Sequence, residues 1–446
     1  MYKPVVYELI PGKDDIFNYN NDVIKSPYQN MPLFSLGFHP YIHQTKEKME
    51  IVNNLKKKRE NFYYVVNPFE HKIPNYEESL SDSTKIYFNL AKDSPKILSR
   101  AFYKLWEILY IFDLIDINQK NITYAALAEG RGSFLQALMY YREKFSQNNS
   151  KKDKYYAVSI HSEDKNVQNI ASQFIGYHEN KNPGRLHVHK TYSKEKAFGS
   201  KTKDNGDLTD IKTISLFKKD IKKNKKWADI VSADGGFQWL DENMQEQEAY
   251  ALLLGEILGA ISVQAKKGSF VLKLFESFTL LTVKMIYIVN MFYDISYIFK
   301  PFTSRPSNSE KYLICKGFKY DQDSKELQQK IKKIEEILEQ FNTKEHINDI
   351  FTQFKVPEDF INLFRNIDTN IANNQQIEIN KMIDYINGNN YYGSKYHKFR
   401  DDQIEATKYW KETFYPINQK VYNEQRETIK KIIDNEIKEN KLVNLI

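Results

Sequence analysis

One lysine stands inside a run of residues that is typical of a buried strand. Residues 268–275 read GSFVLKLF, and Lys273 is the only charged residue among them. The β-branched and aromatic residues around it favour a core strand. A lysine removed from bulk water can lose its charge near neutral pH, because burial disfavours the ammonium form. Lys273 is therefore a candidate base, and the alternative is a strand-end lysine with its ammonium in solvent.

Two acids stand beside neighbouring apolar runs. Asp234 follows the run at 227–233 and precedes two glycines, and Glu310 stands just ahead of the run at 312–315. In an open α/β sheet, functional groups gather at the carboxyl ends of the strands and in the adjoining loops. We therefore expect Asp234, Lys273 and Glu310 to meet at one edge of a sheet.

A further pattern predicts a nucleotide-like ligand. A strand at 123–128 is followed by EGRGSF, residues 129–134, and then by a helix that continues through FLQALMYY. This order brings a ligand against backbone N–H groups at a helix N-terminus. A pair of glycines in this context is a weak signal by itself.

The elements that must position these residues alternate between strand and helix. Strands are expected at 123–128, 155–160, 185–190, 227–234, 268–275, 295–299 and 311–316, and helices at 94–111, 134–141, from 211, 243–264 and 277–293. Such alternation over about 230 residues predicts an α/β fold with a mainly parallel sheet and helices on both faces.

The two ends of the chain differ from the middle in their residue pattern. Residues 1–88 contain many prolines and are predicted to form an irregular arm or small appended region, with one helix around 46–61. Residues 321–446 are predicted to be a helical region, with helices at 324–341, 357–367, 375–386 and 405–438. The chain is thus divided into 1–88, 89–320 and 321–446.

Charge and composition limit the partners. The chain of 446 residues has a net charge of +7, which favours a polyanionic partner without requiring one. Two basic groups, at 56–59 and 218–226, could contact phosphates or could be solvated helix ends. Cys315 is the only cysteine, so an intrachain disulfide and a cysteine metal cage are excluded and a reducing compartment is expected.

No membrane partner is expected from the sequence. The N-terminus lacks a signal-peptide pattern, and the most apolar long run, at 277–299, is interrupted by Lys284, Asn290 and Asp294.

Taken together, the motifs resemble the FtsJ-like (RrmJ-type) ribose 2'-O-methyltransferases. In chain order they are SRAFYKLWEI, LAEGRGSF, GDLTDIKTI, ADIVSADGGF, ENMQEQE, GSFVLKLF and KPFTSRPSNSEKYLICKGF. Within the family the chain is most similar to the cap-directed branch, including the versions carried by large DNA viruses. The resemblance implies a Rossmann-like sheet, S-adenosylmethionine as cofactor, and a catalytic tetrad of Lys104, Asp234, Lys273 and Glu310.

These residue types suit the chemistry that the resemblance implies. A ribose 2'-hydroxyl is a poor nucleophile, so methyl transfer needs in-line placement and removal of the hydroxyl proton. Lys273 would be the base, with its proton affinity balanced by Asp234 and Glu310. Lys104 would lower the pKa of Lys273 and stabilise the developing alkoxide. No metal is needed.

The resemblance also implies a donor site. It consists of Glu129, Gly130, Arg131, Gly132, Ser133, Phe134, Asp207 and Asp234. Arg131 and Ser133 replace the usual proline and glycine, and because a serine tolerates positive φ poorly, we expect donor affinity to be affected. The acid expected on the donor ribose is not clear, and Glu163 and Asp164 are the candidate substitutes.

Two classes of function follow. The first is an enzyme that methylates the cap-adjacent nucleotide of mRNA or another RNA ribose, with RNA and a protein of a capping or transcription assembly as candidate partners. The second is a non-catalytic RNA-binding or assembly subunit that keeps the fold. All four tetrad types are present, which favours the enzyme. The expected location is the cytoplasm, with a viral factory or virion as a further candidate.

Overall fold

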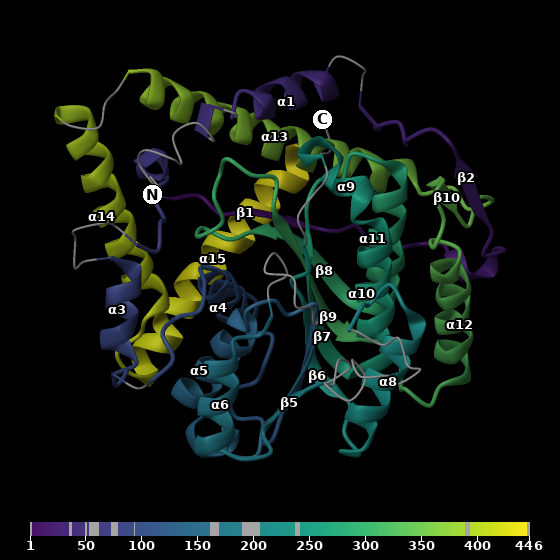
Figure 1. Cartoon of the computed structure of the whole chain (residues 1–446), viewed down its shortest axis with the longest axis horizontal. Coiled ribbons are helices and arrows are strands. Elements are labelled where there is room, and N and C mark those ends of the chain that lie inside the picture. Colours follow the sequence, from purple (N-terminus) through teal and green to yellow (C-terminus); the bar gives the residue numbers. More distant parts are fainter. Residues whose placement is uncertain are drawn as a thin grey trace, which may run out of the picture.

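A single mixed sheet forms the centre of the molecule in the computed structural model (Figure 1). The structure describes residues 2–34, 38–49, 51–52, 62–72, 79–92, 94–160, 169–189, 206–236, 241–388 and 393–443. The strand order is β1-β8-β9-β7-β6-β3-β4-β5. The strands are β1 (Val5–Glu8), β3 (Thr123–Leu127), β4 (Lys154–Val158), β5 (Leu186–Val188), β6 (Ala228–Ala233), β7 (Gln264–Leu274), β8 (Tyr293–Lys300) and β9 (Lys311–Phe318).

The sheet is parallel in its larger part, as predicted. β5, β4, β3, β6 and β7 pair in parallel, whereas β9 lies antiparallel between β7 and β8, and β1 pairs antiparallel with β8. The central strands are apolar along their length because helices cover both of their faces, and every residue of β3 is buried. Strand β1 was not predicted, since its four residues stand among prolines.

Helices form a layer on each face of the sheet and enclose two cores. One layer contains α4 (Ala101–Phe112), α5 (Ser133–Phe145) and α6 (Ser172–Lys181), and the other α8 (Ile211–Lys222), α10 (Tyr250–Val263) and α11 (Leu280–Phe292). Short helices complete this part, namely η3 (Gln147–Ser150), η4 (Glu242–Met244) and α9 (Gln245–Glu248). The α/β fold with a Rossmann-like sheet is therefore confirmed, and α6 is an addition to the prediction.

The helices of the two terminal regions begin and end at other residues than predicted. Their elements are η1 (Ile16–Asn18), β2 (Val23–Ser26), α1 (Phe38–Glu47), η2 (Phe62–Val66), α3 (Leu80–Tyr87), α12 (Lys325–Glu339), β10 (His346–Ile350), α13 (Glu358–Asn387), α14 (Ser394–Phe414) and α15 (Gln419–Val443). The predicted helix at 46–61 is wrong at its start, because α1 already ends at Glu47, and residues 53–61 lie outside the described ranges. One long helix, α13, replaces two predicted ones, and the break before α15 falls at Pro416, which cannot continue a helix.

Helix α13 crosses the carboxyl edge of the sheet, and α1 lies beside it (Figure 1). Asp368 of α13 lies 3.2 Å from the Lys311 ammonium at the start of β9. It also accepts a hydrogen bond from Ser277, which follows β7, at 2.7 Å. Lys46 of α1 forms an ion pair with Glu276 in the same segment. Both ends of the chain therefore contact the edge of the sheet where the predicted chemistry lies. Among the described helices, none is both long and apolar enough to cross a membrane.

Candidate active site

The four predicted tetrad residues meet at the carboxyl edge of the sheet. Asp234 directly follows β6, Lys273 is near the end of β7, and Lys104 is in the first half of α4. Glu310 directly precedes β9, and because β9 runs antiparallel to β7, with Lys311 opposite Leu274, Glu310 reaches the same edge. The Lys273 ammonium lies 3.4 Å from Asp234 Oδ1 and donates to the Asp234 carbonyl at 3.0 Å. Lys104 forms an ion pair with Glu310.

Tyr312 joins the two ion pairs. Its hydroxyl is fully buried and lies 3.1 Å from Asp234 Oδ1 and 3.3 Å from Glu310 Oε1. Residues two apart in a strand face the same side, so Tyr312 in β9 points the same way as Glu310. Tyr312 was not predicted from the sequence, although its spacing from Glu310 could have indicated it.

The charges of this cluster hold one another in their ionised forms. Burial would raise the pKa of Glu310, but the ammonium groups of Lys104 and Lys273 outweigh it and lower that pKa to about 2. Burial would lower the pKa of Lys273, but Asp234, Glu310 and Glu256 outweigh it and raise that pKa above its usual value. The expected depression of the Lys273 pKa is therefore wrong for this state of the site. Lys273 is an ammonium here, and it would lose its proton more readily beside a bound cation.

Glu256 of α10 is a further acid at this site. It is almost fully buried, and its Oε1 accepts a hydrogen bond from the Gly235 N–H at 3.0 Å. Burial raises the pKa of Glu256 to about 8, although Lys273 and the Gly235 N–H oppose this rise. A Cβ on residue 235 would lie 2.2 Å from Glu256 Oε1, so the glycine is what permits the contact. Glu256 was not predicted from the sequence because it stands within an apolar helix.

Lys300 fixes the loop of residues 301–310, which ends in Glu310. The side chain of Lys300 is at the end of β8, and its ammonium donates to the carbonyl of Asn308 at 2.8 Å, to Asn308 Oδ1 at 2.9 Å and to the carbonyl of Glu310 at 2.8 Å. Burial lowers the pKa of Lys300 to about 7, even though the Glu310 carboxylate opposes this shift. Its bonds are to backbone and amide oxygens, so Lys300 holds the loop in place.

The predicted donor turn follows β3 as expected. Ala128 and Gly132 adopt positive φ angles, 49° and 95°, which turn the chain between β3 and α5. Ser133 is the first residue of α5 and is not among the residues with positive φ. The concern about Ser133 is therefore wrong, because Gly132 carries the left-handed conformation. Gly130 and Arg131 lie in the same turn, and the side chain of Arg131 is exposed.

Glu129 lies at the bottom of this turn with its side chain buried. Its Oε1 accepts the Phe134 N–H at 3.3 Å, at the start of α5. Burial and the nearby Asp234 raise the pKa of Glu129 to about 8. A carboxyl group in such a place favours a ligand that brings a positive charge, since the cation stabilises the carboxylate form.

Asp207 reaches the same edge through a contact that requires glycine. Gly206 has a φ of 82°, and a Cβ there would lie 1.9 Å from the carbonyl oxygen of Ser159, directly after β4. Asp207 Oδ1 accepts the Thr209 N–H at 2.9 Å. Asp207 therefore stands beside the end of β4, one strand away from the glycine turn. Glu163 and Asp164 lie outside the described residues.

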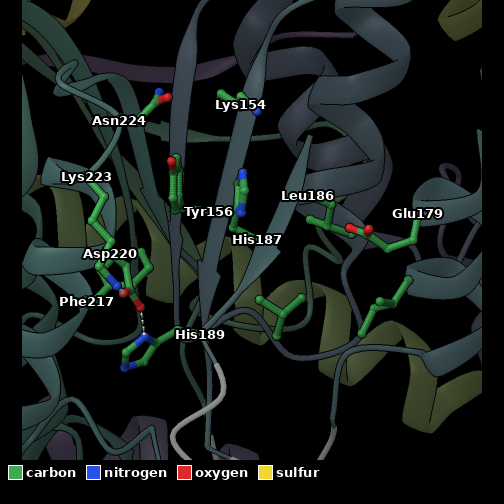
Figure 2. A pocket seen from close by; sticks show the side chains of 12 residues that line it. Lys154, Tyr156, Glu179, Leu186, His187, His189, Phe217, Asp220, Lys223 and Asn224 are labelled. Carbon is green, nitrogen blue, oxygen red and sulfur yellow. Dashed lines mark hydrogen bonds and ion pairs between the residues drawn. The ribbon is translucent and has the colours of Figure 1, made fainter. Parts of the chain in front are cut away.

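A separate pocket of about 630 Å³ lies along the edge strand β5 and contains none of the predicted site residues. Figure 2 shows His187 beside Tyr156 and His189 directed at Asp220, and the two rings of the first pair stack at 4.7 Å. In the ranges that the structure describes, no group of His, Cys, Asp and Glu side chains could hold a metal ion.

The basic group at 218–226 lies at the opposite end of the sheet from the tetrad. Lys226 donates to the carbonyl of Asn121, which precedes β3, at 2.6 Å and pairs with Asp229 near the start of β6 at 2.8 Å. Lys223 pairs with Asp220 at 2.7 Å. Lys226 therefore stands at the amino ends of the strands, and the other basic group, at 56–59, is outside the described residues.

Curated proteins with detectable similarity are cap methyltransferases. "Cap-specific mRNA (nucleoside-2'-O-)-methyltransferase 1" of Mus musculus is 42% identical over 117 residues, which cover 26% of this chain and 14% of that protein. The 1A protein of Caenorhabditis briggsae is 29% identical over 217 residues, 47% of this chain and 24% of that protein. The matches thus span a quarter or less of these relatives.

A solved structure of human methyltransferase-like protein 13 with SAH is 12% identical, covers 58% of this chain and 91% of that chain, and has a TM-score of 0.24. The family model described as FtsJ-like methyltransferase matches residues 97–318, and this range contains all four tetrad residues and the glycine turn. Residues 97–318 are therefore a domain of the FtsJ-like methyltransferase family.

Proposed function

We propose that this protein transfers a methyl group from S-adenosylmethionine to the ribose 2'-hydroxyl of the cap-adjacent nucleotide of mRNA. The observation that carries the proposal is the cluster of Lys104, Asp234, Lys273 and Glu310 at one edge of an FtsJ-like domain. The names of the matching curated proteins support the cap as the target.

In the proposed reaction Lys273 accepts the proton of the 2'-hydroxyl. Its ammonium must first lose a proton, and a cationic donor nearby would favour that loss. The free amine would then take the hydroxyl proton as the 2'-oxygen bonds to the methyl carbon, while the bond from that carbon to the sulfonium sulfur breaks and leaves a neutral thioether. Asp234 and Glu310 stabilise the ammonium that is formed again, and Lys104, which pairs with Glu310, adds positive charge for the developing alkoxide.

The residues that would hold the donor are those of the glycine turn and its neighbours. Backbone N–H groups at the start of α5 and the carboxyl group of Glu129 suit the donor's amino acid end, because the buried carboxyl gains from a positive charge. Asp207, beside β4, is the acid proposed for the adenine amino group. Asp234, which lies near Lys273 and raises the pKa of Glu129 in the turn, is proposed to contact the donor as well. The donor supplies an electrophilic methyl group on a sulfonium.

A non-catalytic RNA-binding or assembly subunit is the alternative. The ion pairs of the tetrad disfavour it, because two lysines and two acids brought out of water impose a desolvation cost that a purely structural role does not require. A protein partner, a viral relationship and a cytoplasmic location stay predictions from the sequence.

The experiment is methyl transfer from radiolabelled S-adenosylmethionine to short RNAs of one sequence, either with a methylated guanosine cap or with a 5' triphosphate. We expect label in the capped RNA, and nuclease digestion should recover it in a 2'-O-methylated first nucleotide. Equal labelling of both RNAs would favour a ribose target away from the cap. No labelling of any RNA, with the donor bound, would favour the non-catalytic subunit.

A further inference from the structure

Two buried tryptophans connect α4 to α14, a helix of the C-terminal region that lies outside the matched family domain. Trp106 of α4 donates its indole N–H to the carbonyl of Phe414 at 3.0 Å. Trp410 of α14 donates its indole N–H to Glu107 Oε1 at 2.9 Å. Both indoles are fully buried. The two contacts are chemically alike, but that of Trp106 ends on a backbone carbonyl and that of Trp410 on a side-chain carboxyl group.

The same carboxyl group of Glu107 also holds the beginning of the 301–310 loop. Its Oε2 accepts the Phe302 N–H at 2.6 Å and its Oε1 accepts the Thr303 N–H at 3.0 Å. Glu107 is fully buried, and a buried carboxyl group depends on such hydrogen bonds for its place in the fold. Burial raises the pKa of Glu107 to about 7, and the three N–H donors oppose this rise because they favour the carboxylate form.

One face of α4 contacts both the beginning and the end of the 301–310 loop. Arg100, which precedes the helix, donates to the Thr303 carbonyl, Lys104 pairs with Glu310, and Glu107 accepts the two N–H groups at 302 and 303. The positions 100, 104 and 107 share one face of a helix because they are four and three residues apart. A shift of Glu107 would therefore move the start of the loop relative to the lysine that pairs with its end.

We propose that Glu107 and Trp410 are positioning residues for methyl transfer. Trp410 orients the Glu107 carboxylate, the carboxylate fixes residues 302 and 303, and the loop then presents Glu310 to Lys104 and Lys273. Helix α14 therefore helps to position the catalytic residues, although it lies outside the family domain. The inference rests on the proposed function, since it concerns the rate of that reaction.

Trp106 offers a matched control for this proposal. Trp106→Phe and Trp410→Phe remove the same indole N–H, at the same pair of helices, from equally buried rings. If the indole bonds only stabilise the packing of α14 on α4, the two variants will have similar effects. If Trp410 positions the loop, only Trp410→Phe will change the chemistry.

The experiment compares the wild type with Trp410→Phe, Trp106→Phe and Glu107→Gln in the full chain. Single-turnover methyl transfer is measured at saturating donor and capped RNA, donor affinity by calorimetry, and amide hydrogen exchange in the 301–310 loop by mass spectrometry. We expect Trp410→Phe and Glu107→Gln to slow transfer by roughly 10-fold or more and to speed exchange in the loop, with donor affinity within about twofold of the wild type. Trp106→Phe should leave both loop exchange and transfer rate near the wild-type values.

The outcomes separate this inference from the proposed function. Equal loss of rate in the two tryptophan variants, or unchanged loop exchange in Trp410→Phe, would overturn the positioning role while the enzyme activity stands. An inactive wild type would overturn the proposed function, and the exchange measurement would still decide whether Trp410 fixes the loop. If Trp410→Phe fails to fold, Glu107→Gln gives the same two measurements.

Discussion

Lys273 carries a proton in the resting site, so the proposed reaction includes a step in which this proton leaves. Asp234, Glu310 and Glu256 together overcome the effect of burial and keep the side chain charged. Asp234 and Glu310 stabilise the ammonium again after the amine has taken the hydroxyl proton. The site therefore favours the protonated lysine both before and after methyl transfer, and the amine is the short-lived form.

Lys273→Ala should reduce single-turnover methyl transfer at least about 100-fold, the scale of a positioned base. Because Asp234 and Glu310 keep Lys273 protonated, the fraction of free amine grows with pH, and the wild-type rate should rise with pH until it levels off at the pKa that Lys273 has in the donor complex. The control is Lys266→Ala on the same strand, whose side chain pairs with Asp321 at 2.8 Å and lies at the surface. Retention of more than a tenth of the activity by Lys273→Ala would rule out Lys273 as the base.

At the level of residues, the sequence predicted charged groups that stand out inside or beside an apolar run and missed others that reach the site only through tertiary packing. Asp234 and Glu310 were found because each borders an apolar run, and Lys273 because it is a charge inside one. Tyr312, Glu256 and Lys300 resemble ordinary strand or helix residues in sequence, and only the pairing of β7 with β9 and the packing of α10 bring them to the site.

At the level of elements, the turn between β3 and α5 depends on Gly132. Its φ of 95° is strained for any other residue, and a Cβ there would lie 3.2 Å from Ile170 and 3.3 Å from Leu98. The turn and its neighbours are therefore fitted to a residue without a side chain.

Gly132→Val should weaken S-adenosylmethionine binding by about 10-fold or more, because a branched residue would displace the turn that is proposed to bind the donor. Calorimetry on the variant measures this. Gly176→Val on α6 is the control, since a Cβ there meets nothing within 4 Å. Unchanged affinity in Gly132→Val would mean that this turn does not bind the donor.

The predicted elements were most accurate where the pattern was long and apolar. All seven predicted strands of the domain are present, and the central ones, such as β3, are buried along their whole length because helices cover both of their faces. Strand β1 and the continuity of α13 could not be read from the sequence, because β1 is short and is held by the edge of β8, and α13 is held by contacts with distant segments such as Lys311.

At the level of the whole molecule, a buried charge of the C-terminal region pairs with a buried charge of the family domain. Asp368 of α13 is buried together with Lys311 of β9, and their charged atoms are 3.2 Å apart. An ion pair of this kind leaves an uncompensated buried charge when one partner is lost. The C-terminal region therefore contributes to the stability of the edge that carries the tetrad.

Asp368→Ala should lower the free energy of unfolding by about 3–5 kcal/mol. Asp359→Ala on the same helix should cost less than about 1 kcal/mol, because its partner Lys13 lies 3.5 Å away in an exposed pair. Urea denaturation followed by circular dichroism compares the two variants. Similar losses in both would show that α13 is not anchored through Lys311.

The basic group at 218–226 provides a test of where RNA lies. Because it stands at the amino ends of the strands, we expect a variant with Lys222, Lys223, Lys225 and Lys226 changed to Gln to bind RNA with the same dependence on salt as the wild type. The measurement is RNA affinity against salt concentration. A flatter slope in the variant would place RNA phosphates at this far end, contrary to the location of the tetrad.

The central claim is that the methyl group goes to a ribose 2'-oxygen next to the cap. It is tested most directly with two capped RNAs that differ only at the first nucleotide, one with a ribose and one with a 2'-deoxyribose. Single-turnover transfer from radiolabelled S-adenosylmethionine is measured on both. We predict transfer to the ribose RNA and none above background to the deoxyribose RNA, whereas equal transfer to both would show that the acceptor is another atom.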